Sequence, residues 1–458
     1  MNSMQHASGV DNGEECISSA LNLFQRPYVD TSINHAYYTR HTPVSAISDS
    51  ATSITIDVPQ SEDFTDLNQS YFLLQTKIVK ADGGALDAFT APDAAGSGNS
   101  VGFINIPSSS MFSNINVVMG EQNLSDNYST YPYLAYFQNL LNFSNDCHAS
   151  LQQLAGFYED KNFSSRSAHT AATDTGFKTR AQLTRRSHYA TFVGVIHHGL
   201  FSQNRFLLPL MPISLEFMKA SNSFVLKSDD TSANYKFQIK SLNMFIRRVK
   251  VKASHKLEIE NQLLKEPCLL PLRHCSVKPL FIDRNTHSVS FENIFNSNSL
   301  PAFCCIALTT QAAYRGSYAT DPFQFDHFRV TSMKITLDNE TYPSPMGFTP
   351  DYVSTSHPDW AQEYFSLFYN DLKSNQGRLI TLDSYKNGGY CMYFFTLGFE
   401  TNEASDHVTP KRVGTGARLE ITFDSGSTNE ALTVLVYQER DEELRIHANR
   451  RVERDYFL

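Results

Sequence analysis

The sequence is poor in charged residues, in tryptophan and in long apolar runs. Charged residues are 19% of the 458-residue chain, and Trp360 is its single tryptophan; soluble proteins usually carry roughly 25% charged residues. Acidic residues outnumber basic ones by 47 to 38, for a net charge of −9, which argues against binding nucleic acid over the whole surface. No apolar run approaches the roughly 18 residues of a membrane-spanning helix, and the polar N-terminus lacks the pattern of a secretory signal. We therefore expect a soluble chain made in the cytosol, without a membrane span.

The cysteines do not form a metal-binding pattern. No CxxC pair occurs, and the spacing of Cys268 and Cys275 fits no common zinc site. Free, buried thiols are the expectation. The seven cysteines are Cys16, Cys147, Cys268, Cys275, Cys304, Cys305 and Cys391.

Catalytic motifs are also missing. The sequence has no HxH, no HExxH, no Gly-x-Ser-x-Gly and no phosphate-binding Gly-Lys-Ser/Thr. His197 and His198 are adjacent in a strand-like stretch, so their side chains point to opposite faces and cannot easily share one metal ion. We expect one of them to point inward and one to be exposed. We therefore predict that the chain is not an enzyme and that it binds neither a cofactor nor a metal ion.

What the sequence has in quantity is alternation of apolar and polar residues, which is typical of half-buried strands. In 52–58, for example, Ile54, Ile56 and Val58 alternate with polar residues. Clusters of Gly, Asn, Asp and Ser separate the strands, as turns require. The clearest alternating segments are 52–58, 235–240, 333–338 and 417–423; further candidates are 71–80, 103–106, 113–119, 191–196, 211–219, 245–252, 276–283, 302–309, 391–399 and 431–438.

Two segments have the spacing of amphipathic helices, 131–143 and 360–372. Thr130 and Ser356 are their expected N-caps, because each is followed two residues later by a proline in the first turn. A weaker helix is expected over 147–158.

The order of these elements occurs twice. In each half, two strands precede a turn and a helix, and about three strands follow, with an offset of roughly 200–230 residues that is far too long for a solenoid. This favours an all-β chain of two tandem eight-stranded jelly rolls with short inserted helices. We divide the chain into an N-terminal arm (1–45), a first jelly roll (46–255), a second (256–440) and a C-terminal tail (441–458).

Several stretches, in this order and spacing, resemble one family over about residues 20–440. The sequence resembles the hexon-like double jelly-roll major capsid proteins of Polinton (Maverick) elements and of the adenovirus-like adintoviruses. The stretches are Leu21-Asn22-Leu23-Phe24, Tyr28-Val29-Asp30-Thr31-Ser32-Ile33, Tyr71-Phe72-Leu73-Leu74-Gln75-Thr76-Lys77-Ile78, Tyr131-Pro132-Tyr133, Leu200-Phe201 with Asn204-Arg205-Phe206-Leu207-Leu208, Phe245-Ile246-Arg247-Arg248-Val249-Lys250, Tyr314-Arg315-Gly316-Ser317-Tyr318 and Pro322-Phe323-Gln324-Phe325-Asp326-His327-Phe328.

The resemblance implies a structural virion protein. Three chains would form a homotrimeric, pseudo-hexagonal capsomer, and neighbouring capsomers with penton and minor capsid proteins would build an icosahedral shell. The shell would enclose double-stranded DNA without sequence-specific contact. The chain would be made in the host cytoplasm, with the nucleus as one option for assembly. The alternative is a tandem β-sandwich binding or attachment module for a glycan or receptor.

Three features leave alternatives open. The long excursions 81–102, 123–190 and 339–390 are rich in Tyr and Phe, which suits either subunit interfaces or each domain's own core. The basic run Arg247, Arg248, Lys250 and Lys252 is either a solvated strand face or a patch facing the capsid interior or a neighbouring subunit; Arg180, Arg185 and Arg186 form a second such group. The mixed-charge tail from Glu439 is either solvated or an arm that docks on a neighbour.

Overall fold

The structure is a computed structural model that describes most of the chain. It describes residues 30–87, 100–126, 128–164, 175–230, 234–295, 300–354, 356–368, 377–397, 416–424 and 429–455. The first 29 residues of the predicted arm and the last three of the predicted tail lie outside this set, as do parts of the predicted helix 360–372 and of the three excursions.

Eight strands of the first half form two four-stranded antiparallel sheets. One has the order β1-β10-β3-β7 and the other β2-β8-β5-β6. A short pair, β4-β9, lies apart from them. The bounds are β1 (Ile33–His41), β2 (Ser53–Val58), β3 (Phe64–Val79), β4 (Val101–Phe103), β5 (Phe112–Met119), β6 (Gln122–Asn123), β7 (Ala190–Gly194), β8 (Ile213–Lys219), β9 (Leu226–Ser228) and β10 (Lys236–Val251).

The second half repeats this arrangement strand for strand. Its sheets have the orders β11-β18-β13-β16 and β12-β17-β14-β15, so each strand holds the position of its counterpart in the first half. One extra strand, β19, pairs with β18. The bounds are β11 (Cys268–Ile282), β12 (Ser288–Glu292), β13 (Phe303–Thr310), β14 (Val330–Leu337), β15 (Glu340–Tyr342), β16 (Met392–Thr396), β17 (Arg418–Phe423), β18 (Leu432–Ile446) and β19 (Val452–Asp455). The predicted pair of eight-stranded jelly rolls is confirmed.

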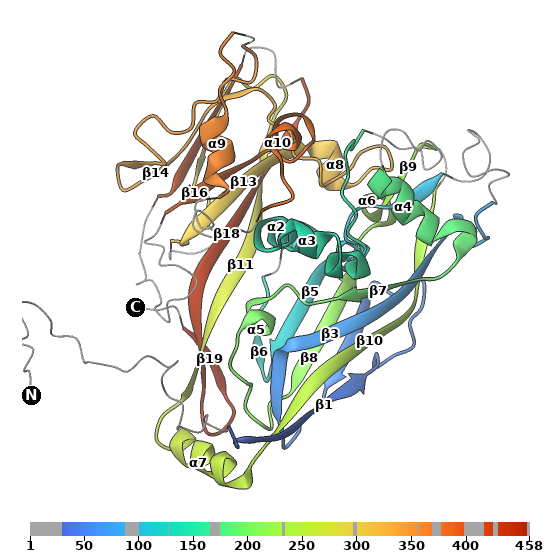
Figure 1. Cartoon of the computed structure of the whole chain (residues 1–458), viewed down its shortest axis with the longest axis vertical. Helices are drawn as coiled ribbons and strands as arrows, with labels where there is room; N and C mark the ends of the chain where they lie inside the picture. Colours follow the sequence, from blue (N-terminus) through green and yellow to red (C-terminus); the bar gives the residue numbers. More distant parts are fainter. Residues whose placement is uncertain are drawn as a thin grey trace, which may run out of the picture.

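Short helices lie at the ends of the sheets and between the two jelly rolls (Figure 1). The α-helices are α1 (Pro107–Ser110), α2 (Tyr131–Asn142), α3 (Asn145–His148), α4 (Thr175–Leu183), α5 (Gly199–Ser202), α6 (Asn222–Val225), α7 (Ala253–Leu263), α8 (Gln311–Arg315), α9 (Ala361–Ser366) and α10 (Leu382–Asn387), and the 3₁₀ helices are η2 (Leu151–Ala155) and η3 (Arg185–Ser187).

The two jelly rolls share one hydrophobic core, which runs without a break from Ile54 in β2 to Val452 in β19. Helix α2 joins its halves, and it lies between the two sandwiches in Figure 1. Tyr136 stacks on Phe323 with ring centroids 4.2 Å apart, and Phe137 stacks on both Phe325 and Tyr437, at 5.3 Å each. All these rings are buried. The aromatic residues of a first-half helix are therefore core residues of the second half.

Several predicted boundaries differ from the structure. Residues 33–41, assigned to the arm, form β1, and the border at 255/256 falls inside α7. The start of the tail continues β18, and β19 pairs with it. Segments 235–240 and 245–252 are one strand, β10.

The predicted helix ends also differ. Thr130 stands at the N-cap position of α2, but its hydroxyl donates to the carbonyl oxygen of Val277 in β11, at 3.0 Å, and makes no cap. Helix α9 begins later than expected, with Trp360 and not Ser356 at its N-cap. The weak helix 147–158 is replaced by α3 and η2.

Candidate functional site

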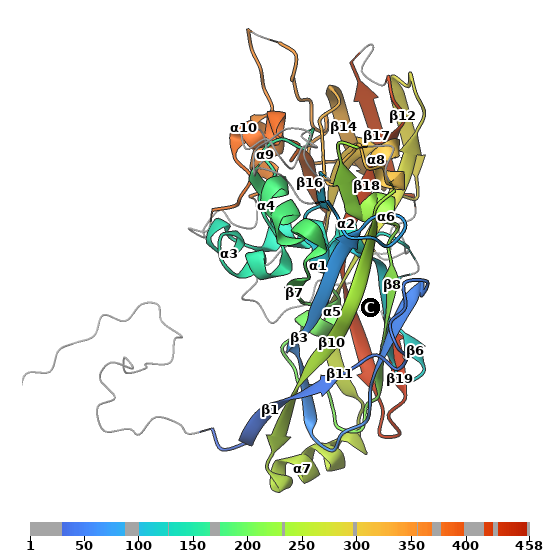
Figure 2. The same ribbon diagram turned by 90° about the vertical axis from the view of Figure 1, so that its right-hand side faces the viewer.

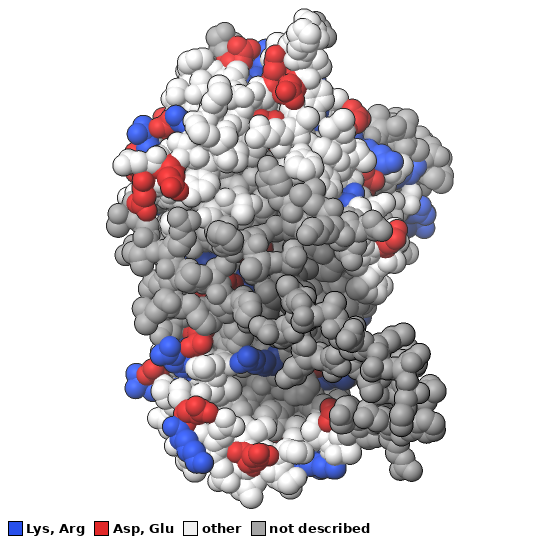
Figure 3. Space-filling model, turned by 60° about the vertical axis from the view of Figure 1, so that its left-hand side comes forward, with Lys and Arg blue, Asp and Glu red and all other residues white. Residues whose placement is uncertain are grey.

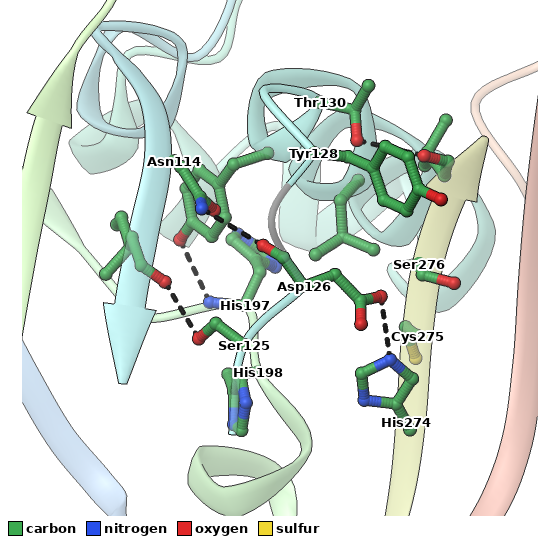
Figure 4. Close-up of a pocket in the computed structure, with 14 residues that line it drawn as sticks. Asn114, Ser125, Asp126, Tyr128, Thr130, His197, His198, His274, Cys275 and Ser276 are labelled. Carbon is green, nitrogen blue, oxygen red and sulfur yellow. Dashed lines mark hydrogen bonds and ion pairs between the residues drawn. The ribbon is translucent and has the colours of Figure 1, made fainter. Parts of the chain in front are cut away.

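A group of polar side chains lies where β11 of the second jelly roll faces the first (Figure 4). A cavity of about 40 Å³ there is lined by Asn114, Asp126, Tyr128, His197, His198 and His274, among others. Such a volume holds a few water molecules but no organic substrate. The lining residues come from both jelly rolls and so connect them. Asn114, Asp126 and His197 belong to the first half, and His274 belongs to the second.

His274 bridges the two halves. Its Nε2 lies 2.9 Å from Oδ2 of Asp126, and Nη2 of Arg454 lies 3.2 Å from its Nδ1. An arginine can only donate, so Nδ1 accepts and Nε2 carries the proton that is donated to Asp126. Burial acts to raise the pKa of Asp126, but the hydrogen bond from His274 and the nearby arginines outweigh it and hold the pKa below its usual value.

Glu442, in β18, is the buried anion of this junction. Its side chain is 2% exposed, and it accepts from Nε of Arg440 at 2.8 Å and from Nε of Arg454 at 2.7 Å. Burial acts to raise the pKa of Glu442, but the hydrogen bond from Arg454 and the charges of Arg454 and Arg440 hold the pKa below its usual value. A buried carboxylate with two guanidinium partners is a structural clamp, because removing a partner would leave an uncompensated charge.

His197 and His198 both point into the protein. Nδ1 of His197 lies 2.8 Å from Oε1 of Gln138, and Nδ1 of His198 accepts from the backbone N–H of Leu200. Nε2 of His198 lies 3.2 Å from the carbonyl oxygen of Leu124. Burial lowers the pKa of each to about 4. The expectation that one would be exposed was wrong, because His198 caps α5 against the second jelly roll.

The junction does not have the chemistry of a nucleophilic site. Burial raises the pKa of the Cys275 thiol well above its usual value, so it stays in the protonated, unreactive form. Its Sγ lies 3.9 Å from the carbonyl oxygen of Arg273. The six cysteines in the described residues are free. In that same part of the chain, no group of three or more His, Cys, Asp or Glu is placed to hold a metal ion.

Two further ion pairs are completely buried, with 0% exposure of all four side chains. Arg180 pairs with Asp160 at 2.7 Å. Lys227, in β9, pairs with Asp321 of the second half at 3.3 Å. Arg180 is therefore an internal structural residue, whereas Arg186 is exposed. The predicted group of Arg180, Arg185 and Arg186 thus does not form one surface patch.

The structure separates the residues of the predicted basic run. Arg248 is 3% exposed and donates to Oγ1 of Thr65. Arg247 pairs with Asp66 at 2.9 Å. Lys250 is exposed, and half-buried Lys252 is at the N-cap of α7. On the face seen in Figure 3, Lys and Arg are likewise interspersed with Asp and Glu and do not form a single-sign patch.

The aromatic residues of the excursions mainly fill the core. Tyr133, Tyr136, Phe348, Tyr385 and Tyr390 are all buried. Tyr128, Tyr189 and Phe365 are exposed, at 42%, 44% and 47%. Of the two open interpretations, the core interpretation holds for most of these rings in the part of the chain that the structure describes.

Sequence reasoning missed the junction residues Asp126, His274, Glu442 and Arg454. The available signal was the mixed-charge stretch that begins at Glu439, which directly continues an apolar strand without a turn residue. Glu439, Arg440, Glu442 and Glu443 are all buried in β18, so this stretch is an internal ion-pair strand.

Comparison with known proteins agrees with this topology. A chain from the Sputnik virophage structure aligns over 98% of this chain and 94% of its own length, with a TM-score of 0.64 at 14% identity. The major capsid protein of mavirus aligns over 100% and 97%, with a TM-score of 0.55 at 11% identity, and that of faustovirus over 92% and 92%, with 0.53 at 10%. This chain has the double jelly-roll fold.

The other comparisons add one relative in sequence. Uncharacterized protein F54H12.2 of Caenorhabditis elegans is 22% identical over 349 residues, which cover 74% of this chain and 78% of the relative. No family model matches the chain. Among the helices that the structure describes, none is long and apolar enough to cross a membrane.

Proposed function

We propose that this chain is a structural virion protein, a major capsid protein of the double jelly-roll type. The observation that carries the proposal is the match over nearly the whole chain to a virophage chain, 98% of one and 94% of the other. The junction supports it, because its buried groups clamp two domains and offer no room for a substrate. A capsid role needs no reactive centre, and we propose that the chain has none.

The proposed assembly is a homotrimer. Two jelly rolls of matching strand order in each chain give six similar units in a trimer, which suits a pseudo-hexagonal capsomer. Neighbouring capsomers, penton and minor capsid proteins would complete an icosahedral shell around double-stranded DNA. We place the chain in the virion, after synthesis in the host cytoplasm and assembly there or in the nucleus.

The finer assignment is to the Polinton and adintovirus lineage. It rests on the sequence stretches given above and is supported by the relative in an animal, Caenorhabditis elegans, as expected for an element that is copied within host genomes. Sequencing the DNA that flanks the gene tests it. Flanks without any other virion or element gene would argue against this lineage.

A role in facing DNA or a neighbouring subunit is proposed for the part of the basic run that reaches the surface, which is exposed Lys250 with half-buried Arg247 and Lys252. Lys250→Glu should lower particle yield or DNA content. Lys236→Glu, an exposed lysine at the other end of β10, should not. Equal yield and DNA content in both variants would refute the role.

Size measurement tests the main proposal. Light scattering of the purified chain should give about three times 51.6 kDa, and negative-stain microscopy should show hexagonal capsomers or shells. A monomer at all concentrations that binds a glycan would favour the attachment-module alternative and overturn the proposal.

A further inference from the structure

Helix α7 connects the two jelly rolls and lies at one end of the molecule, below the sheets (Figures 1 and 2). Leu263 is the one buried residue among its 11, all of which the structure describes. Leu257 is 64% exposed, and Leu264, at its C-cap, is 75% exposed. A helix of this length is only marginally stable in water unless it packs against other residues. We therefore expect a partner to cover its exposed leucines.

One stripe of α7 is already attached to the protein. Nζ of Lys256 donates to the carbonyl oxygen of Glu62 at 2.9 Å, Glu260 pairs with Arg450 at 2.6 Å, and Leu263 packs in the core. These residues have the i, i+4, i+7 spacing of one helix face.

The next stripe around the helix is open. Leu257, Asn261 and Leu264 repeat the same spacing one residue later, and all three are exposed. Leu257 and Asn261 line a shallow groove together with Glu258, Lys265 and Glu266. Oε2 of Glu258 lies 3.7 Å from Nδ1 of His255. In Figure 3 the lower end of the molecule, where α7 lies, carries charges of both signs around uncharged surface.

The described chain starts beside this helix. The carbonyl oxygen of Ser32 accepts from the backbone N–H of Lys252, the N-cap residue of α7, at 2.9 Å. His255 and Lys252 are near enough to help lower the pKa of Asp30, after the larger effect of its hydrogen bonds from Ser32. Asp30, the residue to which 1–29 are joined, therefore lies beside the first turn of α7.

The sequence just before that point matches the open stripe. Ile17, Leu21 and Phe24 have i, i+4, i+7 spacing, and Arg26 is the one charged residue between 16 and 29. Residues 25–29 can span at most about 17 Å, and an 11-residue helix is about 16 Å long. The apolar segment can thus reach either end of the stripe.

We propose that the Leu257–Leu264 stripe of α7 is the docking site for residues 17–24 of the same chain, with Arg26 facing Glu258. The two apolar rows cover each other, and the Glu258 carboxylate in the groove accepts the single cation. This contact goes beyond the proposed function and does not depend on it.

Hydrogen exchange of the full chain, followed by mass spectrometry, tests the contact. Phe24→Asp should speed exchange in 253–264 about tenfold, the change expected from the loss of about one buried apolar side chain. Leu23→Asp places the same charge off the 17–21–24 row and should leave exchange unchanged. Arg26→Glu should speed exchange less, and Glu258→Lys should reverse that effect.

A photo-crosslinker at position 24 gives a second readout. Cross-links to α7 of the same chain support the proposal. Unchanged exchange in Phe24→Asp, or cross-links to another site or to a second copy, would overturn it. Light scattering of the same samples reports the trimer separately, so a failure of this contact and a failure of the proposed assembly can be told apart.

Discussion

At the scale of single residues, the junction depends on histidines that are kept neutral. His198 has a pKa of about 4 because burial removes it from water, and the charge of Arg454 lowers the pKa further against the opposing effects of the Leu124 hydrogen bond and Glu442. Its two ring nitrogens are both used, one by Leu200 and one by Leu124. A proton on Nδ1 would break the first of these contacts.

Stability should therefore fall on acidification. The unfolded histidine has a pKa of about 6.5, so between pH 6.5 and about 4 the unfolded state binds more protons and the folded state loses stability as pH falls. The lowered pKa values of Asp126 and Glu442 act in the same direction at lower pH, since their stabilising charges are lost as pH falls through them.

His198→Asn tests this, because asparagine can still cap α5 but does not titrate. Between pH 7 and 5, urea unfolding of the variant should lose about 1–2 kcal/mol less stability than the parent chain. His188→Asn, at an exposed position, should lose as much stability between pH 7 and 5 as the parent chain does. If His198→Asn loses as much stability between pH 7 and 5 as the parent chain, His198 is not the cause of the loss.

At the scale of elements, α5 and β11 approach so closely that only glycine fits. A Cβ on Gly199 would lie 2.4 Å from the carbonyl oxygen of Arg273. Backbone on both sides prevents an easy adjustment, so the contact fixes the spacing of the two jelly rolls.

Gly199→Ala should lower the free energy of unfolding by about 1–3 kcal/mol, as overpacking usually does. Gly377→Ala is the matched control, because a Cβ there meets nothing within 4 Å. Equal stability of the two variants in urea would contradict the close approach.

The elements that sequence patterns revealed are those with one buried face. Strand β2 alternates buried and open residues along its length, and 52–58 was predicted as a strand. Strand β1 is mainly exposed on both faces, so it carries no period-two signal and was assigned to the arm. In β10, register shifts next to Ile239 and Phe245 interrupt the alternation and split one strand into two predictions.

The junction could not be predicted in the same way. Asp126, His274, Glu442 and Arg454 lie on separate segments that meet only when the two jelly rolls pack. No local pattern encodes that meeting. The polar residues on β18 gave the available hint, but burial of Glu442 depends on contacts with β11, β19 and the first half of the chain.

At the scale of the whole molecule, buried charges connect the halves. Lys227 and Asp321 are both fully buried, Lys227 also donates to the carbonyl oxygen of Phe163, and Asp321 also accepts from the N–H of Phe323. Breaking such a pair leaves one charge without compensation, which costs about 3–5 kcal/mol.

A double-mutant cycle should show this coupling. Lys227→Met and Asp321→Asn should each destabilise the chain, and the double variant should lose about 2 kcal/mol less than the sum of the two. The exposed pair Lys80–Asp87, at 2.7 Å, should give a coupling near zero in the same cycle. Additive costs at Lys227 and Asp321 would mean that the pair does not act as a unit.

Because the aromatic core is shared, residues that pack together are synthesised far apart in time. Phe137 stacks on Tyr437, which the ribosome adds 300 residues later (437 − 137). At about 5–20 residues per second, Tyr437 is added roughly 15–60 s after Phe137. The rings of Tyr136 and Phe137 also stack on Phe323 and Phe325, which are added earlier than Tyr437. The core around α2 is therefore complete only after β18, the last long strand that the structure describes, has been synthesised.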